Sequence, residues 1–300
     1  MQNKHLEHPE DCILTGDLSV LDWFTAPGNL SVKIDGAPAI VWGRNPATGN
    51  FFVGTKSVFN KKLIKINETH SDIDRNHSGR VADILHACFD YLPRTNRIIQ
   101  GDFIGFGGDN TFCPNTITYI FPEKVAAKII IAPHTYYTAE SDLRDAVAHP
   151  MKFSLNDTVD CKFVKVHAEI CPHLDDIEDV CKFAKQMSTL CTFVSDKQAK
   201  KITQVLNRYI REGESIDYVA EYDIASECEC DVNLIRLWNL VQSIKMDLTC
   251  FIATDSSISC EIDGEESEHE GYVMSNKFGT YKIVNRRQFS CANFNLAKNW

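Results

Sequence analysis

The chain has 300 residues and a formal net charge of −10, with 31 Lys and Arg against 41 Asp and Glu. That charge argues against a protein that coats nucleic acid indiscriminately, because such binding is driven by excess cations. No apolar run approaches the roughly 20 residues of a membrane span, and the polar first ten residues do not resemble a signal peptide. Twelve scattered cysteines without a Cys-x-x-Cys pair favour free thiols over zinc ligands or disulfides. We therefore expect a soluble intracellular protein.

Short strands separated by turn residues are predicted for the first 140 residues. A helix is predicted at 79–91, because Val81, Ile84, Leu85 and Cys88 recur at helical spacing and Pro93 follows. The polar segment 67–77 is interpreted as a loop, and Gly105–Gly108 as a hairpin turn. The expected strands are 30–34, 39–42, 51–53, 97–106, 116–121 and 128–131.

The character of the sequence changes after residue 139. Helical periodicity appears at 177–187, 199–210 and 234–248, with Ser195 and Asp231 as candidate N-caps and one strand-like patch at 161–166. Two strands, 270–274 and 279–284, then form a hairpin pattern. The sequence therefore predicts an α+β domain of antiparallel strands, made of residues 1–139 and 250–300, with a mostly helical insertion at 140–249.

One lysine stands out in the first strands. Lys33 lies between Val32 and Ile34 and is followed by Asp35 and Gly36. Because side chains alternate along a strand, Lys33 would enter a cleft that its apolar neighbours help to build. A neutral lysine amine can attack a carbonyl or a phosphorus atom, and Gly36 allows a ligand to approach the backbone closely. Taken alone, the same pattern describes an ordinary solvated strand lysine.

Three further charged residues occur in strand-like segments in a suggestive order. Asp102 is set among apolar neighbours, Glu270 enters the strand Glu-Gly-Tyr-Val, and Lys282 alternates with Tyr281 and Ile283 in the next strand. Each acid could also be an ordinary strand-end carboxylate. Cations concentrate around both lysines, at 31–65 and 277–287, and the two segments could line one basic cleft.

This ordered set resembles the ATP-dependent polynucleotide ligase and capping-enzyme superfamily of covalent nucleotidyltransferases, and in particular divergent, phage-type RNA ligase-like proteins. The resemblance covers roughly 31–121 and 270–286. The matching motifs are KIDG at 33–36, QGDFI at 100–104, TYIF at 118–121, EGYV at 270–273 and YKIV at 281–284. It implies an ATP-grasp-like ligase nucleotidyltransferase fold, with flanking helices and a helical insertion, and a cytoplasmic location, which would be the host cytoplasm if the chain is viral.

The resemblance also implies a mechanism and a set of site residues. Lys33 would attack the α-phosphorus of ATP and carry AMP, which would pass to a 5′-phosphate end and be displaced by a 3′-hydroxyl. Mg²⁺ or Mn²⁺ would be the metal, and Glu270 would orient or bind it and its waters. Asp102 would bind either the ribose or the metal, a role usually given to a glutamate. Lys282 would touch the α-phosphate, and the remaining residues would bind the nucleotide: Asp35, Gly36, Lys56, and Tyr119 or Phe121 against the adenine. Tyr119 and Phe121 could equally be core aromatics.

The chain departs from the family pattern at three positions. Pro38 stands where an arginine is common, and Lys56 is the candidate substitute. Asp102 replaces the usual glutamate, which withdraws its carboxylate by roughly 1.5 Å, about one carbon–carbon bond. Val284 takes the place of a second lysine, for which Lys277 or Arg286 are possible substitutes.

Several functions remain open from the sequence. The favoured one is an RNA ligase, because too few residues follow Lys282 for the OB-fold domain that DNA ligases and capping enzymes usually append. The alternatives are a DNA ligase, a capping-type guanylyltransferase, and a catalytically weak nucleic-acid-binding module with the same fold. The expected partner is nucleic acid, RNA more than DNA, and the basic face of the helix at 199–211 is a further possible contact with it. The sequence does not indicate the oligomeric state.

Overall fold

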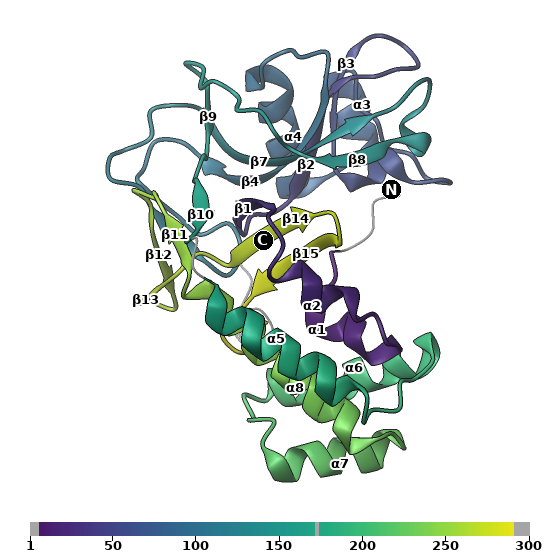
Figure 1. Cartoon of the computed structure of the whole chain (residues 1–300). Helices are drawn as coiled ribbons and strands as arrows, with labels where there is room; N and C mark the ends of the chain where they lie inside the picture. Colours follow the sequence, from purple (N-terminus) through teal and green to yellow (C-terminus); the bar gives the residue numbers. More distant parts are fainter. Residues whose placement is uncertain (1–5, 172–173, 291–300) are drawn as a thin grey trace.

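The computed structural model describes residues 6–171 and 174–290. Its largest sheet has the strand order β3-β2-β4-β7-β8, with β9 added beside β7. All of its pairs are antiparallel except β7 with β9. This sheet forms the upper part of the molecule in Figure 1. Its strands are β2 (Ala39–Arg44), β3 (Phe51–Gly54), β4 (Ile98–Phe106), β7 (Ile129–Thr138), β8 (Val147–Pro150) and β9 (Cys161–Phe163).

Two helices belong to the large sheet, α3 (His70–Asn76) and α4 (Gly79–Tyr91). The buried face of α4 packs on one face of the sheet, where Leu85 shares a core with Trp42 and Phe163. Trp42 and Phe163 stack there at 6.3 Å between ring centroids. The opposite face carries a second core, which includes Val41, Phe52 and Tyr137. Both faces of the sheet are therefore covered, which holds the strands rigidly in register.

A separate three-stranded antiparallel sheet lies between the upper part and the helices below it (Figure 1). Its order is β1-β14-β15, so the first strand of the chain pairs with the last hairpin. The pairing sets Lys33 opposite Gly271 and Lys282 opposite Val273. Residues more than 230 positions apart in the sequence thus become neighbours. The strands are β1 (Asn29–Lys33), β14 (Gly271–Asn276) and β15 (Gly279–Val284).

Two smaller antiparallel sheets complete the β-structure. One has the order β13-β12-β6-β5, and the other pairs β10 with β11. Phe112 and Tyr119 from the four-stranded sheet, and Phe121 directly after β6, share a core with Ile104 of β4 and Val284 of β15. This core therefore joins all three larger sheets. The strands are β5 (Thr111–Phe112), β6 (Thr118–Ile120), β10 (Ala168–Ile170), β11 (Ile252–Thr254), β12 (Ser259–Ile262) and β13 (Glu265–Ser267).

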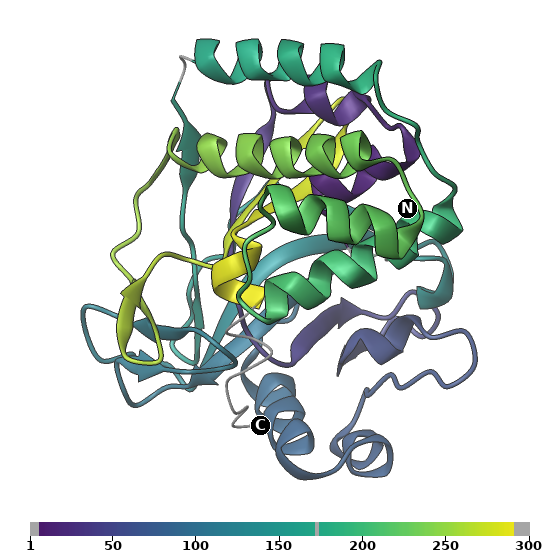
Figure 2. The ribbon, with the colours of Figure 1, turned by 90° about the horizontal axis from the view of Figure 1, so that it is seen from below.

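The helices gather below the three-stranded sheet, and Figure 2 shows them in front of its strands. Their apolar faces share one core with the sheet, which contributes Tyr272, Met274 and Ile283. Trp23 of α2 and Trp238 of α8 are fully buried in it. The helical part is thus packed directly against the strands that carry Lys33 and Lys282. The helices are α1 (Pro9–Cys12), α2 (Ser19–Trp23), α5 (Asp175–Ser188), α6 (Asp196–Arg211), α7 (Tyr218–Cys228) and α8 (Val232–Thr249).

The α+β class with antiparallel sheets is confirmed, as are the helix at 79–91 and the final hairpin. Ser195 and Asp231 cap α6 and α8 as expected. The cysteines of the described ranges are free. Within those ranges, no helix is long and apolar enough to cross a membrane.

Other expectations need correction. The segment 140–170 is not part of a helical insertion, because β8 and β9 complete the large sheet, and the helices of the insertion begin at Asp175. The segment 67–77 contains α3, which Thr69 and Asp72 start with a reciprocal capping box. Gly105–Gly108 is not a hairpin turn, because β4 pairs with β2 and β7 while β5 pairs with β6. Residues 1–5 and 291–300 of the expected domain lie outside the described residues.

Candidate nucleotidyl-transfer site

The centre of the candidate site is a lysine–glutamate pair on neighbouring strands. Lys33 ends β1, and Glu270 immediately precedes β14, which pairs with β1. Lys33 Nζ donates a hydrogen bond to Glu270 Oε2. Val32, on the opposite face of the strand, packs against the helical core. The alternation of the strand therefore aims the lysine away from the core and at the carboxylate.

Glu270 lies in a crowded electrostatic environment. Burial raises the pKa of its carboxyl group, and the negative charges of Asp35 and Asp102 raise it further, whereas Lys33 lowers it. The net result is a pKa above the usual range for a glutamate. Asp35 and Asp102 thus lie close enough to Glu270 to influence its protonation. Glu270 is the carboxylate that contacts Lys33 directly.

Lys282 joins this group from the adjacent strand. Burial lowers the pKa of its amine, as do the positive charges of Lys33 and Arg286, while Glu270 and Asp11 act in the opposite direction. Two lysines, Lys33 and Lys282, therefore share a partly buried region with Glu270. Such a cluster of cations is suited to an anionic ligand, because the ligand's charge relieves the repulsion between them.

The turn after β1 is fixed by close packing. A Cβ at Gly36 would lie 2.8 Å from the Cβ of Asp102 and 2.9 Å from the backbone oxygen of Phe103, so only glycine fits here. Asp35 accepts hydrogen bonds from Asn115 Nδ2 at 2.9 Å and from the Thr116 N–H at 3.1 Å. Both contacts hold the Lys33 segment against the connection between β5 and β6 of the four-stranded sheet. Asp35 thus anchors the segment that follows Lys33, and Gly36 allows this segment to pack closely against Asp102.

Asp102 of β4 is accompanied by a histidine. His134 Nε2 of β7 lies 3.7 Å from Asp102 Oδ2 and 3.4 Å from Gln100 Nε2, while His134 Nδ1 lies 2.7 Å from Thr135 Oγ1. The segment Ala-Pro-His-Thr at 132–135 predicts a loop histidine in a structural hydrogen bond. His134 is instead a strand residue beside a candidate metal ligand, and the register of β4 and β7, which brings the two together, has no local sequence signal.

The two candidate adenine-stacking residues lie in the core. Tyr119 is 2% exposed and Phe121 is 6% exposed, and Phe121 packs edge-on against Phe112 at 5.5 Å. The Tyr119 hydroxyl accepts a 2.6 Å hydrogen bond from the Asp35 N–H, and burial raises the pKa of this hydroxyl well above its ordinary value. Neither ring presents an open face to a base in this structure. Tyr119 instead positions the segment that follows Lys33.

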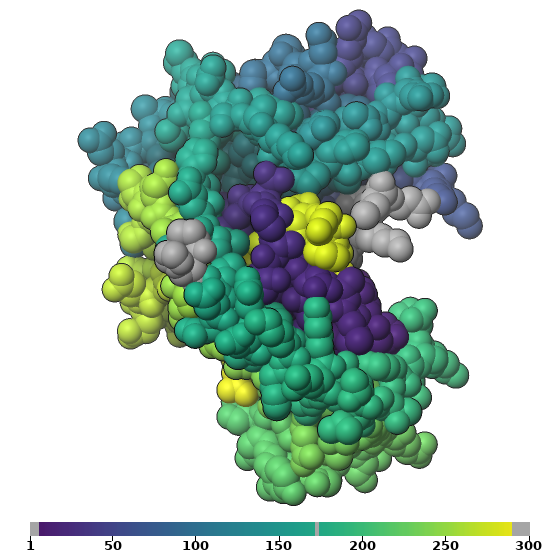
Figure 3. All heavy atoms as spheres, viewed as in Figure 1, coloured from purple at the N-terminus to yellow at the C-terminus, as the bar shows by residue number. Residues whose placement is uncertain are grey.

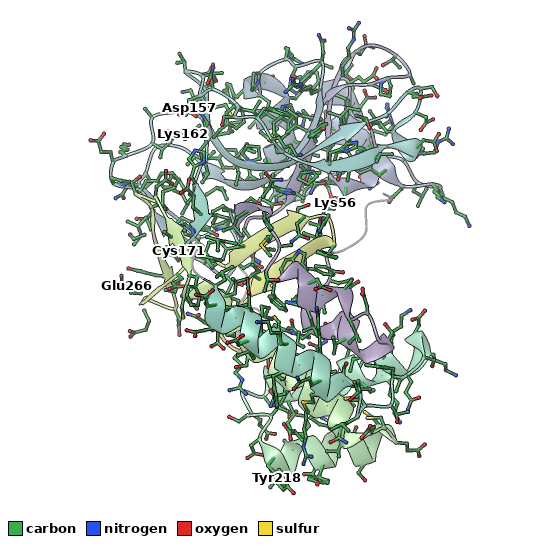
Figure 4. The ribbon with its side chains drawn as sticks, in the orientation of Figure 1. Lys56, Asp157, Lys162, Cys171, Tyr218 and Glu266 are labelled. Atoms are coloured by element: carbon green, nitrogen blue, oxygen red, sulfur yellow. The ribbon has the colours of Figure 1, made fainter. Side chains whose placement is uncertain are left out.

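Lys56 makes no contact with the group formed by Lys33, Glu270 and Lys282 among the interactions of the described residues. It begins a short 3-10 helix, Lys56–Phe59, and its side chain is exposed, as Figure 4 shows. No ion pair involving Lys56 occurs among the described residues. Of the sequence-predicted cations, Lys33 and Lys282 therefore share the region around Glu270, and no hydrogen bond or ion pair joins Lys56 to Glu270 among the described residues.

An N-terminal segment, which the sequence reasoning did not include, packs beside the site. The Lys282 N–H donates to the Glu7 backbone oxygen at 3.2 Å, and the side chain of His8 is largely buried, at 12% exposure. Burial lowers the pKa of His8, and Arg286, Lys245, Lys282 and Lys33 lower it further, so His8 is neutral. In Figure 3 this N-terminal part surfaces beside the C-terminal hairpin where the molecule narrows.

A buried ion cluster fixes this N-terminal segment. Lys245 Nζ donates to Glu10 Oε1 at 2.5 Å, and Arg286 Nη1 lies 3.2 Å from the same oxygen and 2.9 Å from Asp11 Oδ1. Arg286 also donates to Asn207 Oδ1 at 2.5 Å. The cluster ties α1, α6 and α8 to the end of β15. In the sequence, the sign of this ion cluster is Lys245, a lysine on the apolar face of the 234–248 helix.

The carboxylates fit a metal that arrives with a phosphate ligand. Within the described ranges, no group of three or more His, Cys, Asp or Glu side chains is arranged to hold a metal ion. Mg²⁺ is usually bound by one or two carboxylates together with phosphate oxygens, and does not need an all-protein cage. Glu270 and Asp102, which influence each other electrostatically, are the candidates for such a pair. The site is therefore compatible with Mg²⁺ bound jointly by protein and nucleotide.

Comparison with known proteins places the chain in a family. Searches of curated proteins and of solved structures return no significant match. A family model described as "Family of unknown function (DUF6267)" matches residues 3–223 and 217–298, which together span almost the whole chain. The protein therefore belongs to DUF6267, a family of unknown function.

Proposed function

We propose that the protein is an ATP-dependent polynucleotide ligase, acting on RNA ends through a covalent lysyl-AMP intermediate on Lys33. The observation that carries the proposal is the Lys33–Glu270 pair with Lys282 on the next strand, which matches the order of the nucleotidyltransferase motifs. The corresponding fold is an ATP-grasp-like nucleotidyltransferase core formed by the antiparallel sheets. RNA with 5′-phosphate and 3′-hydroxyl ends is the proposed substrate.

The first step joins Lys33 to AMP. The Nζ–phosphorus bond forms as the bond between the α-phosphorus and its bridging oxygen breaks, and pyrophosphate leaves with the electron pair. One proton of the Lys33 ammonium passes to Glu270 Oε2, which already accepts a hydrogen bond from it. The second proton, which the nitrogen loses as its bond to phosphorus forms, leaves with the pyrophosphate. Burial assists this transfer, because it raises the pKa of Glu270 and so favours its protonated form. Lys282 stabilises the negative charge of the α-phosphate.

The remaining residues position the nucleotide and the chain. Glu270, through its other oxygen, and Asp102 would hold Mg²⁺ or Mn²⁺, which supplies charge neutralisation on the phosphates. Gly36 and Asp35 keep the Lys33 segment close to Asp102. In the later steps AMP passes to a 5′-phosphate oxygen, and a 3′-hydroxyl displaces it, which forms the phosphodiester bond and releases AMP.

The test is covalent self-labelling. The protein is incubated with α-labelled ATP or GTP and Mg²⁺, and the denatured protein is examined for bound label. We expect an ATP-derived adduct that is acid-labile, as a phosphoramide bond is, and that disappears in Lys33→Ala and Lys33→Arg. Lys61→Ala, which removes an exposed lysine from the same basic segment, is the matched control and should label normally.

Other outcomes separate the alternatives. Label from GTP alone would identify a capping-type guanylyltransferase. Absence of label from both nucleotides, with a folded protein, would overturn the proposal and leave the nucleic-acid-binding module. If the ATP adduct forms, the labelled protein is mixed with single-stranded RNA or with nicked duplex DNA, each carrying 5′-phosphate ends. The nucleic acid that receives the label distinguishes an RNA ligase from a DNA ligase.

A further inference from the structure

A groove at the far end of the large sheet combines cations with aromatic rings. It has a volume of about 640 Å³ and lies where the β2–β3 turn, the start of β4 and the end of β7 meet residues 152–153. Arg44, Arg97 and Lys152 line it together with Tyr136 and Phe153, and no Asp or Glu is among the lining residues. The lining of this groove is therefore positively charged, although the protein as a whole has a net charge of −10.

The three cations are available to a ligand. Each is exposed, and among the described residues none of them takes part in an ion pair. Arg44 is oriented by a 2.9 Å hydrogen bond from its Nε to the Gly49 oxygen, which leaves its two terminal nitrogens for other acceptors. Glu68 binds the other side of this turn through Asn45 and Asn50, and it does not line the groove.

The aromatic rings form a partly exposed stack beside these cations. Tyr136 stacks on His149 with 4.9 Å between centroids and contacts Phe153 at 5.6 Å. The guanidinium of Arg97 lies 4.0 Å above the Phe153 ring. Flat rings and a flat guanidinium offer stacking surfaces to nucleic-acid bases, and the cations offer contacts to phosphates. A fully paired duplex keeps its bases stacked on one another, so single strands suit this arrangement better.

We propose that this groove binds single-stranded nucleic acid, with Arg44, Arg97 and Lys152 on its phosphates and Tyr136 and Phe153 beside its bases. The groove is distinct from the Lys33 site. Ala39 pairs with Asp102 near Lys33, and Arg44 lies five residues along the same strand, roughly 17 Å away at about 3.3 Å per residue. If the groove holds a polynucleotide end during sealing, that role rests on the proposed function. The affinity of the groove for single strands does not depend on the proposed function.

Fluorescence anisotropy with 5′-labelled oligouridylate, without ATP or metal, tests the groove separately from self-labelling. The triple variant Arg44→Gln/Arg97→Gln/Lys152→Gln should bind at least tenfold more weakly. The slope of log affinity against log salt should shrink by about 2, at about 0.7 for each phosphate contact. Tyr136→Ala should also lose about tenfold in affinity, by removal of one stacking contact, while its salt slope stays unchanged.

A control of equal charge lies on α6. Lys197→Gln/Lys200→Gln/Lys201→Gln removes three exposed cations from the helix that is the other candidate for a phosphate contact, and it should leave affinity and slope unchanged. The groove proposal fails if this variant loses the affinity and the groove variant keeps it. It also fails if oligoglutamate competes as well as the oligonucleotide, which would identify a site for acidic peptides. Labelled oligodeoxyuridylate, run in parallel, shows whether the groove distinguishes RNA from DNA.

Discussion

Glu270 is the residue whose protonation links stability to the proposed chemistry. Its pKa is raised in the folded protein, mainly by burial, so folding favours its neutral form. The cost of holding the carboxylate charged is absent at low pH, appears as the pH rises through the pKa of an unfolded glutamate, and is complete above the raised folded pKa. A residue of this kind stabilises the protein less at neutral pH than an uncharged analogue would.

Glu270→Gln is therefore expected to separate stability from activity. Relative to the wild type, its unfolding free energy should increase as the pH rises above about 4, the pKa of an unfolded glutamate, because the variant carries no charge to bury. Self-labelling should fall by about 100-fold or more, as expected when a group that accepts a proton is lost. Urea unfolding at several pH values measures the first effect. A pH-independent difference between the two proteins would show that Glu270 is not held at a raised pKa.

Gly36 provides a second test at the scale of a residue. In Gly36→Ala the new methyl group must displace Asp102 or the backbone of β4, which should cost about 1–3 kcal/mol and slow self-labelling. Gly213→Ala is the control, because Gly213 has a φ of +74° and no neighbour within 4 Å of a Cβ. It should be destabilised by backbone strain while the labelling rate is retained. Equal labelling rates in the two variants would show that the Gly36–Asp102 spacing has no effect on the site.

At the scale of elements, the ion cluster around Glu10 locks the helices to the strands. Burial alone would raise the pKa of Glu10, but Lys245 and Arg286 outweigh it and hold this pKa below its usual range. The cluster therefore stabilises the protein above the pKa of an unfolded glutamate, and this contribution is lost as the pH falls through the lower folded pKa.

Glu10→Gln should cost about 3–5 kcal/mol in unfolding free energy, because it leaves two buried cations with Asp11 alone. The double variant Glu10→Leu/Lys245→Met removes one charge of each sign. Its loss of unfolding free energy should be smaller than the sum of the losses in Glu10→Leu and in Lys245→Met. Urea unfolding of the full cycle measures this coupling. Strict additivity would show that Glu10 and Lys245 do not interact.

Elements with a strong local pattern could be predicted from the sequence, and elements that depend on distant partners could not. The helix at 79–91 and the final hairpin carry their periodicity within a few residues. By contrast, α3 buries only Ile73 and starts with a capping box in a polar segment, so it lacks an apolar period. β8 was not predicted, and β9, whose strand pattern at 161–166 was predicted and is confirmed, joins the large sheet only by pairing with β7. This is why the boundary of the helical part was placed 35 residues too early, at 140 rather than 175.

The same distinction holds for the candidate site. The order of Lys33, Asp102, Glu270 and Lys282 predicted a cluster. The register of β1, β14 and β15 brings Lys33, Glu270 and Lys282 together, and close packing of Gly36 on Asp102 brings β4 beside them. The pairs Lys245–Glu10 and Arg286–Asp11 join residues 235 and 275 positions apart, and no local rule links such positions. Burial of Tyr119 and Phe121 likewise depends on how three sheets meet.

At the scale of the whole molecule, one core unites the helices with the strands that carry the candidate site. We therefore expect Leu206→Ala in α6, a fully buried position in this core, to cost about 2–5 kcal/mol. The midpoint temperatures for loss of helical circular dichroism and for loss of self-labelling should fall together, because β14 and β15 depend on the helices for their apolar face. Val219→Ala, next to Tyr218 at the far end of the helical part in Figure 4, changes a side chain that is 64% exposed and should shift neither midpoint. Self-labelling that persists above the melting of the helices would show that the three-stranded sheet holds Lys33 without them.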